Sequence, residues 1–332
     1  MGTPITGSST QKVTFKPPEE QPKARPVSEK QKKAAVEPAS DEFEARAAGR
    51  HPPVTLNAAS PLPSDTGAAV PTNGTTSAKY QVGPPRRPAI QHDNGFLQNP
   101  KDPKDPNPIA TREPSMSDRL AEAKWAVKLE AARRLRPDLK DATDAYSHFL
   151  SGNGKDRTFD YERFVTQDES GKKVLKSATQ DTQKAAEAQY AAMIAKDPSL
   201  AGKPITFQIT GGPIGVGGND GKFPYPQTEN WQKAIGGHSI WNSATVTVTP
   251  PSTPGGKPSF SMDMTVHAED RYNFNPNQKD IATGIPDSDN GRFEQTGLAH
   301  QYTQTGSVQR KVSWPQGDIE NATSNPINNG RR

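Results

Sequence analysis

The sequence predicts an α+β fold, because the spacing of its apolar residues changes along the chain. Apolar residues recur at helical intervals between residues 115 and 196, and they alternate as in β-strands after residue 200. The first 110 residues differ from both parts, since they hold 18 of the 33 prolines and only four of the 22 aromatic residues. We therefore expect four segments: a disordered arm rich in Pro, Ser and Lys (1–113), a small helical subdomain (114–200), a compact and mostly antiparallel β-domain (201–315) and a polar tail (316–332).

The composition argues against several classes of protein. The apolar fraction of the 332 residues is 30%, below the roughly 45–50% of ordinary globular chains. A net charge of +4, from 41 basic and 37 acidic residues, is too small to predict nucleic acid as a partner. Without cysteine there is no disulfide, thiolate metal site or cysteine nucleophile. No apolar run is long enough for a membrane span, and the N-terminus lacks the apolar core of a classical secretory signal.

The predicted arm alternates proline with charge and has no sustained period, as in Lys16-Pro17-Pro18-Glu19-Glu20. Two interpretations stay open. The arm is a solvated linker, or it is a delivery segment that passes unfolded through secretion or uptake machinery. Its Ser-, Thr- and Pro-rich opening, with the first acidic residue at Glu19, is similar to bacterial type III export signals. We therefore expect a secreted protein.

Three helices are expected in the second segment. The first spans 115–135 and ends at Arg136-Pro137, with an apolar stripe made of Leu120, Ala123, Val127, Ala131 and Leu135. The second spans about 138–150 and ends at Gly152-Asn153-Gly154, where positive φ angles are accessible. The third spans about 177–196 and ends at Asp197-Pro198.

Strands follow over about 205–209, 240–249, 260–274 and 308–314, with a helix over about 292–302. In the third strand, the even-numbered residues from Phe260 to Ala268 are apolar and share one face, whereas the odd-numbered residues are expected on a solvated face. The same register places Asp270 and Tyr272 on the buried face. A buried carboxyl without a partner is costly, so Asp270 is expected to be paired or functional. The alternative is that the strand ends at Ala268 and Asp270 caps the following turn.

Two motifs resemble the activity domain of colicin M-like bacteriocins. Asp270-Arg-Tyr272-Asn-Phe274-Asn275 is similar to the family's Asp-x-Tyr-Asp-Phe-Asn signature. Upstream, Ala145-Tyr-Ser-His148-Phe149-Leu150-Ser-Gly152-Asn153-Gly154 is similar to its Ala-His-Tyr-Leu-x-Gly-Asn-Gly segment. The motifs occur in the family's order, and the resemblance covers about residues 140–315.

The resemblance implies a β-domain of colicin M type and a phosphodiesterase that depends on a divalent cation, Mg²⁺ or Ca²⁺. The family cleaves lipid II between the undecaprenyl chain and the pyrophosphate, which blocks peptidoglycan synthesis. It acts in the periplasm of the target cell, at the inner membrane. An immunity protein is a further partner that the resemblance suggests. A carboxylate that holds a cation against a pyrophosphate suits this chemistry.

The resemblance also implies the site residues. Asp270 matches the family's essential aspartate and is the expected metal ligand, and Tyr272 matches its tyrosine. Asn273 stands where the family has a second aspartate, and Asn275 matches the asparagine that ends the family's signature. The family's His-Arg pair falls on Lys279 and Asp280 in an ungapped alignment, or near Asp289 to Arg292 with an insertion, so Arg292 is expected to bind phosphate.

Neither alignment supplies the family's histidine. Asp280 or Asp289 is expected to replace it, unless His148, His238, His267 or His300 does so.

Two other functions stay open. One is a secreted effector or interaction protein that keeps the fold without activity, which the absent histidine and Asn273 favour. The other is an unrelated metal-dependent hydrolase or a carbohydrate-binding module, because acidic and aromatic residues serve those functions equally well.

Overall fold

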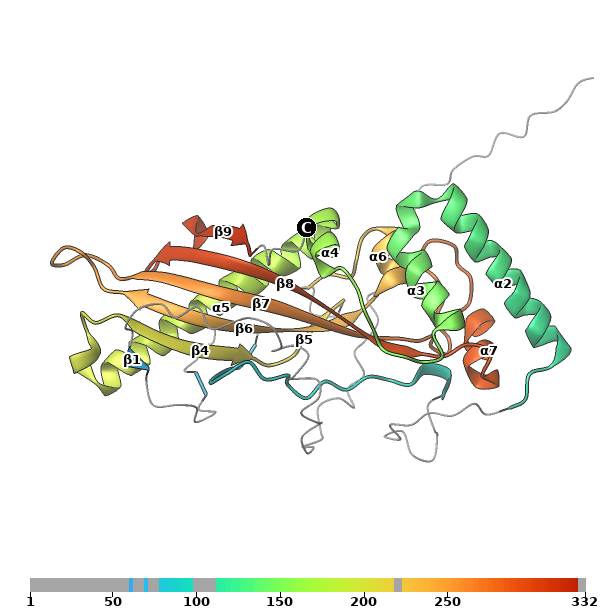
Figure 1. The fold of residues 1–332 in the computed structure, drawn as a ribbon, viewed down its shortest axis with the longest axis horizontal. Coiled ribbons are helices and arrows are strands. Elements are labelled where there is room, and N and C mark those ends of the chain that lie inside the picture. The colour runs from blue at the N-terminus through green and yellow to red at the C-terminus, as the bar shows by residue number, and fades with distance from the viewer. Residues whose placement is uncertain (1–59, 62–68, 71–77, 98–111, 218–222, 328–332) are drawn as a thin grey trace, which may run out of the picture.

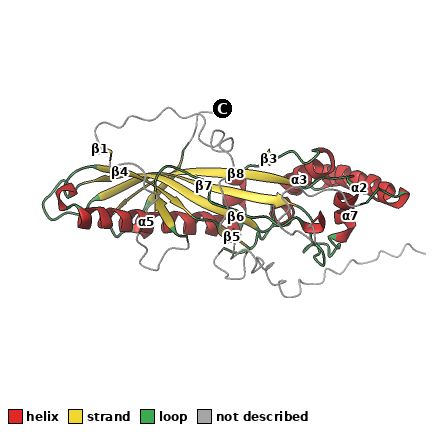
Figure 2. Cartoon of the chain, turned by 90° about the horizontal axis from the view of Figure 1, so that it is seen from below, coloured by secondary structure: helices red, strands yellow, loops and turns green. Residues whose placement is uncertain are grey.

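The computed structural model describes residues 60–61, 69–70, 78–97, 112–217 and 223–327. These residues form an α+β molecule: a long twisted sheet with one helix, α5, along one of its faces and a group of helices at one end (Figures 1 and 2). No helix in these ranges combines the length and the apolar character that a membrane span needs. The predicted fold class is confirmed at this level.

The sheet is mostly antiparallel and has nine strands in the described ranges. Its long strands are β4 (Ile205–Gly211), β6 (His238–Thr249), β7 (Ser259–Tyr272) and β8 (Tyr302–Pro315), which lie side by side in that order. Five short strands add to them: β1 (Ser60–Pro61), β2 (Tyr80–Val82), β3 (Arg157–Thr158), β5 (Ile214–Val216) and β9 (Thr323–Pro326). Only the pairings of β1 with β4 and of β3 with β8 are parallel among the described strands.

Six α-helices and four 3-10 turns accompany the sheet in the described ranges. The α-helices are α2 (Met116–Leu135), α3 (Lys140–Ser151), α4 (Tyr161–Gln167), α5 (Glu169–Lys196), α6 (Glu229–Ala234) and α7 (Ser288–Thr296). The 3-10 turns are η2 (Gly95–Leu97), η3 (Pro137–Leu139), η4 (Pro198–Leu200) and η5 (Ile319–Asn321). The helix predicted over 177–196 thus begins at Glu169, and that predicted over 292–302 is α7, which Gly297 ends at φ 69°.

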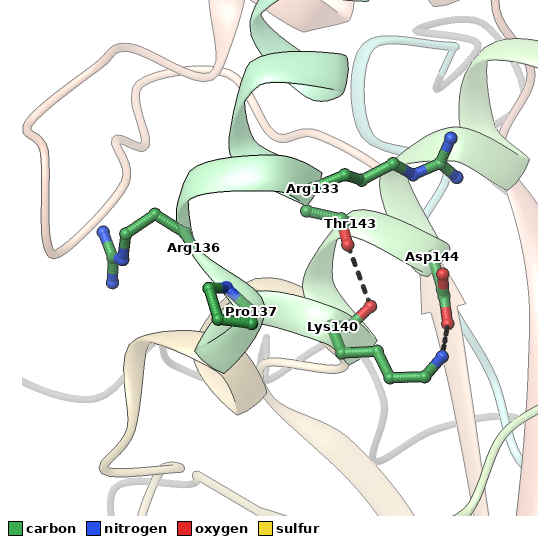
Figure 3. A pocket seen from close by; sticks show the side chains of 6 residues that line it. All are labelled: Arg133, Arg136, Pro137, Lys140, Thr143 and Asp144. Carbon is green, nitrogen blue, oxygen red and sulfur yellow. Dashed lines mark hydrogen bonds and ion pairs between the residues drawn. The ribbon is translucent and has the colours of Figure 1, made fainter.

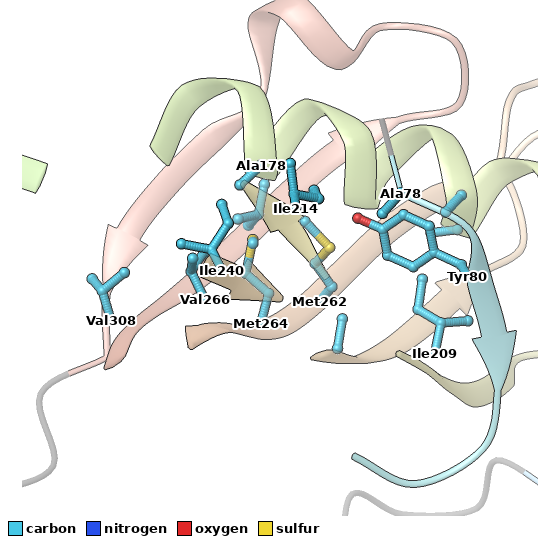
Figure 4. Close-up of a cluster of buried hydrophobic side chains, with 14 of the residues drawn as sticks. Ala78, Tyr80, Ala178, Ile209, Ile214, Ile240, Met262, Met264, Val266 and Val308 are labelled. Atoms are coloured by element: carbon cyan, nitrogen blue, oxygen red, sulfur yellow. The ribbon is translucent and has the colours of Figure 1, made fainter. Parts of the chain in front are cut away.

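The main core lies between α5 and the even-numbered face of β7. Phe260, Met262, Met264 and Val266 are all at most 1% exposed, as their alternation predicts. The facing side of α5 is rich in alanine, including Ala178 and Ala186, so the helix backbone lies close to the sheet. This core therefore takes side chains from both sides of residue 200 (Figure 4).

A second apolar cluster lies where β7 ends and β8 begins. Phe149 of α3, Phe293 of α7, Ala299 and Tyr302 are buried there. The side chain of Ser115 caps α2, and Asp118 of that cap binds Arg112 and Arg292. These contacts join α2, α3 and α7 to the end of the sheet.

The predicted disordered arm and the predicted polar tail both contain ordered residues. Residues 69–70 and 78–97 of the predicted arm pack on the sheet, where Val70 and Tyr80 are 3% and 1% exposed. Tyr80 bonds to Thr182 of α5 and Asn242 of β6 (3.0 and 3.2 Å). In the predicted tail, β9 pairs with β8 and η5 packs against the core. Residues 1–59 of the arm, including the export-like opening, lie outside the described residues.

Candidate functional site

Asp270 is a buried residue of a strand that continues past it. Strand β7 pairs with β8 as far as Tyr272, so the alternative of a turn cap at Asp270 is wrong. The Asp270 residue is 7% exposed, and its Oδ2 accepts a hydrogen bond from Gln304 Nε2 at 2.9 Å. The same Nε2 donates to the carbonyl of Ala234 at 2.6 Å. Asp270 therefore occupies a polar position between the two apolar clusters.

The two motifs that resemble the colicin M family meet in the second cluster. The ring of Phe149, from the upstream motif, lies 5.9 Å from Tyr272 and 5.1 Å from Phe274 between centroids. Tyr272 also stacks on Tyr302 at 5.1 Å, and the Tyr302 hydroxyl donates to the carbonyl of Ala145. Segments more than 100 residues apart in the sequence thus form one aromatic contact beside Asp270. Burial raises the pKa of Tyr272 far above its usual range, so this phenol stays protonated.

The opposite face of β7 is covered at this end, contrary to the prediction of a solvated face. Glu269 is 3% exposed, and its carboxylate accepts hydrogen bonds from Arg87 Nε (2.7 Å) and Nη2 (2.5 Å). His92 Nε2 lies 2.7 Å from the same carboxylate. Burial acts to raise the pKa of Glu269, but these hydrogen bonds outweigh it and lower the pKa to about 2. Residues 84–97 are thereby fixed across the sheet.

The loop after β7 is held by acidic side chains. Asn273 Nδ2 donates to the carbonyl and to Oδ1 of Asp93. The backbone N–H of Phe274 donates to Glu294 Oε1 (2.9 Å), and that of Asn275 donates to Asp287 Oδ2 (3.1 Å).

Glycine is required where residues 84–97 meet this loop. Gly95 has φ 50°, and a Cβ atom placed there would lie 2.1 Å from the Phe274 carbonyl oxygen.

Glu294 is a buried carboxyl of this end of the molecule with a raised pKa. It is 1% exposed, and burial raises its pKa to about 8 despite the hydrogen bond from Phe274. Its Oε2 has no hydrogen-bond partner among the described residues. A proton on this oxygen at neutral pH makes Glu294 a weak acid inside the site. Sequence reasoning missed it because a glutamate on a short polar helix is normally a surface residue.

Arg271 supplies a guanidinium beside these acids. Its Nε donates to Gln301 Oε1 (3.2 Å) and its Nη1 to Thr303 Oγ1 (3.1 Å). Burial lowers its pKa, although Asp156 and Glu294 act in the other direction. A guanidinium bound mainly by neutral oxygen atoms keeps donors for a phosphate group, so Arg271 is a candidate that the sequence analysis did not single out.

Two of the other predicted site residues have structural partners, and two are exposed. Arg292 binds Asp118 of α2 through Nε (2.7 Å) and Nη2 (2.6 Å). Asp280 accepts from Lys233 and from Thr283, which fixes a turn, and Lys279 is exposed. Asp289 is exposed at the start of α7.

The four histidines considered as replacements lie in different surroundings. His148 packs edge-on against Tyr302 (4.5 Å), and its Nε2 lies 2.6 Å from the Lys155 carbonyl oxygen. His238 is a buried residue of β6 that bonds to Tyr161, and burial lowers its pKa to about 4. His267 stacks on Trp241 at 3.7 Å, and burial lowers its pKa to about 3. His300 is exposed. His148 thus lies nearest to the aromatic contact with Tyr272.

No group of three or more His, Cys, Asp or Glu side chains suited to a metal ion occurs in the described part of the chain. The Asp270 carboxylate is bound by the side-chain amide of Gln304. Mg²⁺ is often bound by one or two carboxylates together with substrate phosphates. Asp270 supplies one such carboxylate.

A cavity of about 300 Å³ lies elsewhere, at the junction of α2 and α3. Its lining includes Arg133, Arg136 and Lys140, and Figure 3 shows these side chains around the turn that joins the two helices. It includes none of the predicted site residues.

No family model, curated protein or solved structure matches this chain.

Proposed function

We propose that the chain is a secreted antibacterial toxin of colicin M type that hydrolyses lipid II. The observation that carries the proposal is the contact of Phe149 with Tyr272 and Phe274, which brings the two family-like motifs together beside Asp270. Two sequence motifs support a common functional site when the fold brings their residues into contact. The proposal places the activity in the periplasm of a target cell, with delivery through the N-terminal arm and with an immunity protein as the producer's protection.

In this proposal, Asp270 holds a divalent cation, Mg²⁺ or Ca²⁺, against the pyrophosphate. The cation, when bound, neutralises charge on the phosphate oxygens. Hydrolysis adds the oxygen of water to phosphorus and transfers a proton to the departing undecaprenyl oxygen. Asn273 and Asn275 line the loop that faces the sugar-phosphate part of the substrate, with Lys279 at its edge. Glu294 is a positioning residue, because it binds the backbone of Phe274.

The test is an assay of the full chain with purified lipid II and Mg²⁺, in which chromatography measures released undecaprenol. We expect release that a chelator abolishes and that Asp270→Asn lowers by roughly 100-fold or more, since several kcal/mol of transition-state stabilisation is lost. Asp263→Asn is the matched control, because Asp263 lies on the same strand and is exposed. Circular dichroism checks that each variant is folded. Intact lipid II in the presence of folded wild-type protein would overturn the proposal.

The second candidate is a secreted interaction protein that keeps this fold without activity. It is favoured by the internal partners of the predicted residues: Gln304 binds Asp270, Asp93 binds Asn273, and Asp118 binds Arg292. Expression in two compartments separates the candidates. A lipid II hydrolase is harmless in the cytoplasm and toxic when exported to the periplasm, whereas toxicity of an interaction protein does not follow this pattern.

A further inference from the structure

Helix α2 has an apolar stripe that faces solvent. The helical spacing of the sequence predicts such a stripe, but its large side chains are not buried: Met116 is 73% exposed, Leu120 65%, Val127 70% and Leu135 77%. Spacings of four, seven and eight residues place them along one side of the helix. In the described ranges, the only other large apolar residue that is exposed is Ile281, which is 44% exposed.

The opposite side of α2 fixes the helix to the molecule. Leu129 is buried, and Trp125 packs on Tyr146 of α3 with ring centroids 5.8 Å apart. At the helix start, the Asp118 carboxylate binds Arg112 and Arg292. The apolar stripe therefore plays no part in holding α2 in place, and α2 lies at one end of the molecule, outside α3 and α7 (Figure 1).

Basic residues flank the stripe on both sides. At about 100° per residue, Lys124 and Lys128 lie on one flank of the stripe, Arg119 and the exposed Glu130 lie on the other, and Arg134 lies within the stripe. Arg119, Lys124 and Arg134 form no ion pair with any described acidic residue.

The basic character continues beyond Leu135. There the stripe ends next to the cavity that Arg133, Arg136 and Lys140 line (Figure 3). Arg133 pairs with Glu130 at the surface, and Arg136 pairs with Asp138 and Glu229. Lys140 pairs with Asp144, which also lines the cavity. Such exposed pairs are weak, so a phosphate group can compete for these guanidinium groups.

We propose that the outer side of α2 is a peripheral membrane-binding surface for bilayers that contain anionic phospholipid. Exposed apolar side chains bordered by basic residues are the features by which an interfacial helix inserts shallowly among lipid headgroups. This inference does not depend on the lipid II proposal, although a lipid-linked substrate would lie at the same surface.

Vesicle sedimentation of the full chain tests this surface. The vesicles contain phosphatidylcholine alone or with about 30% phosphatidylglycerol. We expect binding to the anionic vesicles only, decreasing as salt is added. The double variants Leu120→Ser/Val127→Ser and Lys124→Glu/Lys128→Glu should each weaken binding by about tenfold or more, because one removes apolar contact and the other removes attraction to the headgroups.

Matched controls and a second measurement decide the outcome. Ile281→Ser and Lys173→Glu change exposed residues of the same types away from α2 and should leave binding unchanged. Equal binding by the α2 variants and the wild type, or no binding to anionic vesicles, would overturn the proposal. A dimer in analytical ultracentrifugation that Leu120→Ser/Val127→Ser abolishes would assign the stripe to a second copy instead.

Discussion

At the scale of single residues, Glu294 makes the stability of the fold depend on pH. Its pKa is about 8 in the folded protein, against 4.5 for an ordinary glutamate. Because the folded state holds the proton more tightly, the stabilisation is complete below pH 4.5 and is lost as the pH rises through 8. The full loss in the free energy of unfolding is on the order of 3–5 kcal/mol. Glu294→Gln carries no titrating proton and keeps an oxygen for the N–H of Phe274.

The measurement for Glu294 is urea unfolding of both proteins between pH 5 and pH 9. We expect the wild type to lose stability relative to Glu294→Gln over this interval. Asp289→Asn, an exposed carboxyl of the same helix, should follow the wild-type profile. Parallel profiles of the wild type and Glu294→Gln would show that Glu294 is ionised in the folded protein.

At the scale of elements, residues 84–97 depend on one buried ion pair. The Glu269 side chain is 4% exposed, and Arg87→Ala removes its bidentate partner and leaves a buried carboxylate. We expect a loss of about 3–5 kcal/mol in the free energy of unfolding at pH 7. Hydrogen exchange should also increase over 84–97 before the rest of the sheet opens. Arg86→Ala is the control, since Arg86 is the exposed neighbour, and an equal effect of both variants would contradict this role of Arg87.

The same elements show what the sequence could and could not predict. Strand β7 and helix α2 were predicted closely, because each has a long apolar period, and α2 also has a clear start and stop. The order of residues 78–97 was missed, since this stretch contains Pro84, Pro85 and Pro88 and no period. Its order depends on contacts such as Arg87 with Glu269, which are 182 residues apart in the chain. At the site, the sequence indicated Asp270 and its motif. It indicated neither the buried Glu294 nor the burial of Glu269 beneath Arg87 and His92.

At the scale of the whole molecule, the packed stretch 78–97 decides which fragment of the chain folds. A fragment that begins at Ser115 keeps every long strand but loses Tyr80, which is 1% exposed and bonds to both α5 and β6. It also loses the partners of the Glu269 carboxylate. Loss of a buried aromatic residue alone costs about 3–5 kcal/mol, which is comparable to a large part of the stability of a typical domain.

We therefore expect a fragment starting at residue 60 to unfold cooperatively near the melting temperature of the full chain. We expect a fragment starting at Ser115 to melt well below it or to remain unfolded. Thermal unfolding followed by circular dichroism and tryptophan fluorescence makes the comparison. The two ends of the molecule share β7 and β8, so a single transition should report on both the main core and the aromatic cluster around Phe149. A Ser115 fragment that melts like the full chain would mean that residues 78–97 lie on the sheet without stabilising it.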